Sequence, residues 1–206
     1  MQDQDIYSEL NSIRNLMERS AKFISLSGLS GILAGVYALV GACLAYYLVY
    51  GTTGGLDYGD HYVNEEAVVL QLFFIAIVVL VLSLSTGILL TVRKAKIKGE
   101  KVWNPSSKKL LVNMAIPLVT GGILILILLL RGYFGIIAPA TLIFYGLALV
   151  AGSHYTFTDV KWLGIYEITL GLIAACLPGF GIFFWTIGFG VLHIIYGSIM
   201  HFRYDK

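Results

Sequence analysis

Residues 67–92, AVVLQLFFIAIVVLVLSLSTGILLTV, contain no charged side chain and a single amide, Gln71. A helix needs roughly 20 consecutive apolar residues to cross about 30 Å of hydrocarbon, and this run exceeds that length. The rest of the chain agrees, because 58% of its 206 residues are hydrophobic, 13% are charged and the mean hydropathy is +0.83. Soluble domains are about half apolar and a quarter charged. The sequence therefore predicts an integral membrane protein.

Five further apolar runs are long enough to be considered as spans. With residues 67–92 they give six candidates, which are 26–50, 67–92, 110–131, 133–152, 162–178 and 181–202. Tight Gly/Pro turns at 131–132 and 178–181 separate the last four into two hairpins. We therefore expect an all-α bundle of six transmembrane helices in three hairpins, forming one domain over residues 26–206.

The basic residues indicate how these spans are oriented. In a six-span arrangement thirteen of the 14 Lys and Arg residues fall on one side, and only Arg131 falls on the other. Because positive residues favour the cytoplasmic side, both termini are expected there. The polar first twenty residues have no basic region followed by a cleavage site, so the first span is expected to serve as its own insertion signal.

Residues 1–25 are expected to form a cytoplasmic amphipathic helix. Within 6–24, apolar residues recur in steps of three and four, with acids early and bases late, as the helix dipole favours. This helix would lie on the inner leaflet or pack on the bundle. The alternative is a pairing surface for a second copy of the chain, giving a homo-oligomer, or for a cytoplasmic protein partner.

Two loops carry opposite charge. The cytoplasmic loop, 93–109, is basic and is expected to face anionic lipid, although the positive-inside rule alone explains its charge. Within it, Asn104 or Ser106 is expected to cap the next helix, with Pro105 at an early position. The outer loop, 51–66, is acidic and matches no calcium-loop spacing. The bases of the cytoplasmic loop are Arg93, Lys94, Lys96, Lys98, Lys101, Lys108 and Lys109.

Glu167 is the one acid within a predicted span, and ionisable groups in a bilayer need a partner or a purpose. It shares a helix face with small residues at 171 and 174, and His193 lies on a similar small-residue face of the next helix. We expect the two faces to meet across a hairpin. Glu167 would then hydrogen-bond Tyr196 and approach His193.

Other polar residues in the cytoplasmic half are candidates for the same intramembrane site. Asn113 and Thr120 share one face of the third span, and Tyr145 lies on a small and polar face of the fourth. Two interpretations remain open for this set. One is a structural network that locks the bundle, and the other is a proton or ion relay or a ligand pocket.

Motifs for other functions are absent. The sequence has no HExxH, GxSxG or P-loop, so we expect no enzyme and no catalytic residues. No histidine pair is placed to ligate haem, and Cys43 and Cys176 are interpreted as small core residues, so no cofactor or metal is expected. A net charge of +2 does not suggest nucleic-acid binding.

Three segments carry a resemblance. They are MERS at 17–20 with FISLSGLSG at 23–31, PATLIFYGL at 139–147 and GFGVLHIIYG at 188–197. Over nearly its whole length the chain resembles a family of small, uncharacterised polytopic bacterial inner-membrane proteins. The resemblance implies a bacterial inner-membrane location and a regulatory partner, and it carries over no catalytic residue.

Two functions follow as expectations. The first is a non-enzymatic sensor, regulatory or scaffold protein whose N-terminal helix or basic loop contacts a partner. The alternative is a small transporter or channel with a polar site around Glu167 and His193.

Overall fold

The computed structural model describes residues 27–50, 66–99 and 101–204, and over these residues it contains helices and no strand. The predicted N-terminal helix, 1–25, and nearly all of the acidic loop, 51–66, lie outside them. The long helices are α2 (Gly28–Tyr50), α3 (Glu66–Ile97), α4 (Pro105–Leu130), α5 (Ile137–Ser153) and α6 (Asp159–Cys176). A short helix, η2 (Phe134–Ile136), precedes α5. The last helix is continuous from 181 to 204 and comprises α7 (Gly181–Trp185), the π-helical segment η3 (Thr186–Leu192) and α8 (His193–Tyr204).

Among the residues that the structure describes, five helices are long and apolar enough to cross a membrane. They are α2, α3, α4, α5 with η2, and the last helix. Helical backbone suits such segments because hydrocarbon offers no hydrogen-bond partner to free N–H and C=O groups. Large apolar side chains cover the outer surface of α3 and α4, as expected where helices contact lipid tails.

The remaining predicted span, 162–178, corresponds to α6. This helix has 18 residues and carries Asp159, Lys161 and Glu167. With η2 counted as part of α5, α6 is the shortest of these six helices and has the highest proportion of charged residues, although it packs closely alongside α5.

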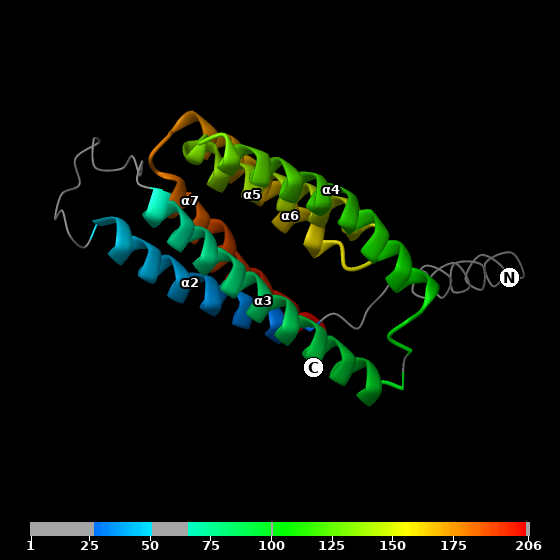
Figure 1. Cartoon of the computed structure of the whole chain (residues 1–206). Coiled ribbons are helices and arrows are strands. Elements are labelled where there is room, and N and C mark those ends of the chain that lie inside the picture. The colour runs from blue at the N-terminus through cyan, green and yellow to red at the C-terminus, as the bar shows by residue number, and fades with distance from the viewer. Residues whose placement is uncertain (1–26, 51–65, 100, 205–206) are drawn as a thin grey trace, which may run out of the picture.

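The helices form two groups, visible in Figure 1. In one, α2 packs against both α3 and the last helix; in the other, α5 packs against both α4 and α6. The last helix contacts α6 much less extensively than it contacts α2, and α3 makes no extensive contact with α4. We call these sets the α2 group and the α4 group. They meet where the last helix passes α5 and α6.

Glycines determine how closely the helices approach within each group. A Cβ added at Gly197 would contact the backbone nitrogen of Ile32 and lie 2.8 Å from the carbonyl oxygen of Gly28 on α2. In the α4 group, a Cβ at Gly164 would lie 2.7 Å from the carbonyl oxygen of Gly146. Both contacts require glycine, because a side chain would have to enter the neighbouring backbone.

These contacts correct the expectation that two small-residue faces meet across the last hairpin. The face of α6 packs on α5, since a Cβ at Gly171 would lie 2.9 Å from the carbonyl oxygen of Pro139. The face of the last helix packs on α2, where Gly190 lies against Leu39. Small residues pair best with neighbouring backbone, so each face is used by the helix that approaches it most closely.

The predictions about the α4 cap and the two cysteines had different outcomes. The Asn104 side chain caps α4 by accepting a hydrogen bond from the backbone amide of Ser107 at 2.8 Å, and the Ser107 hydroxyl group accepts one from the amide of Asn104. Pro105 is the first residue of the helix. This confirms the predicted cap. The interpretation of Cys43 and Cys176 as core residues was wrong, because both are exposed on the outer surface. Their apolar surroundings are those of residues facing hydrocarbon rather than of a protein core.

The glycine contacts give a prediction about stability. Replacing Gly197 by Ala forces α2 and the last helix apart and should lower the free energy of unfolding by about 1–3 kcal/mol, the usual effect of overpacking. The measurement is thermal unfolding of the purified protein in mild detergent.

Gly122→Ala is the matched control, since a Cβ there meets nothing within 4 Å. It should be neutral or stabilising by up to about 1 kcal/mol, because Ala favours helix more than Gly. Equal destabilisation by both variants would contradict the close approach at Gly197.

Candidate functional site

The candidate site centres on Glu167, in the middle of α6. Its side chain has an exposed fraction of 0% and lies against Gly188 and Leu142. A Cβ added at Gly188 would come within 2.5 Å of the Glu167 Oε2 atom. Glycine at 188 therefore makes the space in which the carboxyl group lies.

His193 faces this carboxyl group. Its Nδ1 atom lies 3.5 Å from the Glu167 Oε1 atom and 3.0 Å from the carbonyl oxygen of Gly188. His193 follows the π-helical segment Thr186–Leu192, and π-helical turns often occur at functional sites. The Gly188 carbonyl group accepts a hydrogen bond from the ring of His193, five residues further along the chain, and this bond holds the imidazole in place.

Tyr145 of α5 completes the cluster. Its hydroxyl oxygen lies 2.8 Å from the Nε2 atom of His193. A carbonyl oxygen can only accept, so Nδ1 carries a proton toward Gly188. In a neutral His193 the Nε2 atom then accepts the hydrogen of the Tyr145 hydroxyl group. Sequence analysis included Tyr145 among the candidates for the site but did not pair it with His193, because the pairing of α5 with the last helix is tertiary information.

Two buried side chains in this region lack a hydrogen-bond partner among the described residues: the carboxyl group of Glu167, at each of its oxygens, and the hydroxyl group of Tyr196. The expected hydrogen bond between Glu167 and Tyr196 is therefore not formed, whereas the expected approach of Glu167 to His193 is confirmed. Tyr196 instead packs with its ring against the apolar cluster of Leu149, Val160 and Leu163.

Asn113 and Thr120 do not join the cluster. The Asn113 amide donates to the carbonyl oxygen of Lys109 at 2.8 Å, and the Thr120 hydroxyl donates to that of Ile116 at 2.8 Å. Thr120 is exposed on α4. Their polar groups are satisfied within their own helix, as is common for such residues in apolar surroundings.

The seven predicted lipid-facing bases gather at one end of the bundle, which we call the basic end. Lys94 is half-buried with its Nζ atom 5.9 Å from the ring centroid of Phe157, and Lys108 lies 5.4 Å from that of Trp103. The remaining five are exposed: Arg93, Lys96, Lys98, Lys101 and Lys109.

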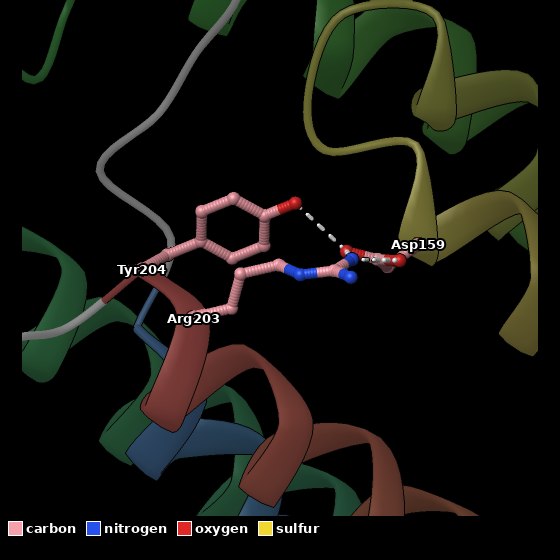
Figure 2. Close-up of polar contacts among 3 residues, drawn as sticks. All are labelled: Asp159, Arg203 and Tyr204. Carbon is pink, nitrogen blue, oxygen red and sulfur yellow. Dashed lines mark hydrogen bonds and ion pairs between the residues drawn. The ribbon is translucent and has the colours of Figure 1, made fainter.

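A polar bridge at the basic end joins the two groups, as Figure 2 shows. The Arg203 Nη1 atom lies 3.1 Å from each carboxylate oxygen of Asp159, and the Tyr204 hydroxyl group donates to the same carboxylate at 2.9 Å. Phe157 stacks on Tyr204 with ring centroids 4.1 Å apart. Sequence analysis missed this bridge. The available signal in the sequence was an acid, Asp159, just before the predicted span 162–178 and at the same end as Arg203.

A cavity of about 920 Å³ lies between the groups. Its walls are α2 and α3 on one side and α4 and α5 on the other, with the last helix behind. The lining is mainly apolar, and Tyr145, His193 and Tyr196 contribute to the inner wall. Glu167 lies outside the lining, behind His193.

No protein-family profile, curated protein or solved structure matches the chain. Within 27–50, 66–99 and 101–204, no group of three or more His, Cys, Asp or Glu side chains is placed to hold a metal ion. The carboxyl group of Glu167, the imidazole of His193 and the phenol of Tyr145 can exchange protons and form hydrogen bonds.

The hydrogen bond between Tyr145 and His193 can be tested by Tyr145→Phe. This change leaves the buried Nε2 atom without its partner and should lower the free energy of unfolding by about 1–3 kcal/mol. Tyr166→Phe on the exposed face of α6 is the control and should have little effect. Equal effects in detergent unfolding experiments would show that the hydrogen bond does not stabilise the fold.

Proposed function

We propose that this chain is a non-enzymatic sensor or regulatory protein of the bacterial inner membrane. In this proposal six helices cross the bilayer, both termini and the basic end are cytoplasmic, and the basic end faces anionic lipid and a protein partner. The positive-inside distribution of Lys and Arg supports this orientation.

One observation carries the proposal. The α2 group contacts the α4 group through the last helix, which packs on α5 and α6 and carries His193 and Arg203. The helices α3 and α4 make no extensive contact with each other, and a cavity lies between the two groups. Two groups joined mainly through one helix can change their separation by a rigid-body shift, a common form of switching transition. Such a shift would move the ends of α6 and α8, which lie beside the proposed partner surface.

The ion pair of the bridge is well placed to respond to a signal. The Arg203 side chain is 59% exposed and that of Asp159 is 24% exposed. Exposed ion pairs contribute little to stability, so a ligand or partner with a modest preference for one arrangement would be able to break this one.

Asp159→Asn tests the proposal. This change removes the charge that holds Arg203 and should increase the distance between spin labels at positions 162 and 202, where Trp162 and Phe202 are exposed. The distance is measured by double electron–electron resonance in a protein in which Cys43 and Cys176 are replaced by Ser. In the host, Asp159→Asn should alter the levels of the same transcripts whose levels change when the gene is deleted.

Lys161→Gln is the control, because it removes a charge at the same end but not from the bridge. It should leave both the spin-label distance and the transcripts unchanged. An Asp159→Asn protein with a wider distance and unaltered transcripts would contradict the regulatory function.

The transporter alternative is supported by a specific observation. Glu167 and His193 hold their ionisable atoms 3.5 Å apart with no other partner for the carboxyl oxygens among the described residues. A carboxyl group in this position can take up and release a proton beside an imidazole, as acidic residues do in the proton relays of membrane transporters. A proton flux in proteoliposomes that is lost in Glu167→Gln but kept in Asp159→Asn would favour this alternative over the sensor.

A further inference from the structure

The cavity between the two groups has dimensions that limit what it can hold. Its lining extends from Ser27, directly before α2, along this helix to Ala45, about 27 Å at the usual rise of 1.5 Å per residue. The volume of about 920 Å³ is spread along this length, and the lining is mainly apolar. An elongated apolar cavity of this kind suits an extended hydrocarbon chain.

The side between α3 and α4 gives access to this cavity. These helices make no extensive contact with each other, yet both contribute to the lining. A Cβ added at Gly87 on α3 or at Gly122 on α4 would meet nothing within 4 Å. Both helices are apolar enough to cross a membrane, so the opening faces the hydrocarbon of the bilayer.

Charge distinguishes the two ends of the cavity. At the basic end, where Gly28 and Met200 line it, the surrounding helix ends and connections carry Lys and Arg residues. Arg131 is the one described base at the opposite end. Basic residues near a membrane surface attract anionic lipid by about 1 kcal/mol each.

We propose that an anionic phospholipid inserts an acyl chain between α3 and α4 into the basic-end part of this cavity, with its headgroup among the bases. The hydrocarbon core is about 30 Å thick, and an acyl chain belongs to one leaflet, which is half of it. One chain therefore fills only part of the cavity length of about 27 Å. This inference rests on the proposed function in that it names the ligand class that would set the separation of the two groups.

Photolabelling tests the proposal on the full chain reconstituted in phosphatidylethanolamine vesicles. A trace of phosphatidylglycerol carrying a photoreactive diazirine in one acyl chain is added, and labelled peptides are mapped by mass spectrometry. Label is expected on lining residues such as Ser83, Tyr145 and Leu149. The same reactive chain on zwitterionic phosphatidylcholine is expected to label them much less.

Gly87→Phe should remove most of this label, because its ring would occupy the space beside α3. Ile88→Phe is the matched control: Ile88 is 62% exposed and lies outside the lining, so the label should remain. Gly122→Phe provides a second blocking variant if Gly87→Phe does not fold.

Three outcomes would overturn the proposal. They are label confined to outward residues, equal labelling by the two lipids, and a cross-linked second copy in place of lipid. Photolabelling measures lipid binding, so its result is independent of the test of the proposed function. Lipid can bind in the cavity even if Asp159→Asn leaves the transcripts unchanged.

Discussion

The buried carboxyl group of Glu167 is the constraint on which the arrangement of the helices depends. It has an exposed fraction of 0%, and the nearest ionisable atom is Nδ1 of His193 at 3.5 Å. An ionisable group in hydrocarbon is unfavourable unless it faces the protein interior and a partner. Placing it there requires α6 to turn this face toward the last helix, and requires glycine at 188 to leave room.

The same contact explains why the two groups meet where they do. The last helix is held against α2 by close glycine contacts, and α6 is held against α5 in the same way. Tyr145 and Glu167 then reach His193 from two helices of the α4 group. Beside the last helix, α3 and α4 make no extensive contact with each other, and the two groups enclose the cavity there. A polar cluster at the seam and an apolar cavity beside it are thus two results of one packing arrangement.

Much of this fold could be predicted because hydrophobic length and charge are local properties. The helix bounds differ from prediction by a few residues, for example at α3, which continues to Ile97 instead of ending at Val92. The Asn104 cap was also predictable, since a cap depends on neighbours within one turn.

What could not be predicted depends on which helices pair. Small residues on the last helix fitted a partner in α6 as well as one in α2, and the sequence contains nothing to decide between them. For the same reason Asn113 and Thr120 were grouped with Glu167, while the pairings of Tyr145 with His193 and of Asp159 with Arg203 were missed. Cys43 was assigned to the core because an apolar run looks alike whether it faces protein or lipid.

The most direct test of the account is a double-mutant cycle between Glu167→Gln and His193→Gln, with free energies of unfolding measured by denaturant titration in mixed micelles. If the two side chains interact across the seam, the effects will be non-additive by at least about 1 kcal/mol. Additivity to within about 0.5 kcal/mol would contradict the claim that this contact joins the two groups of helices.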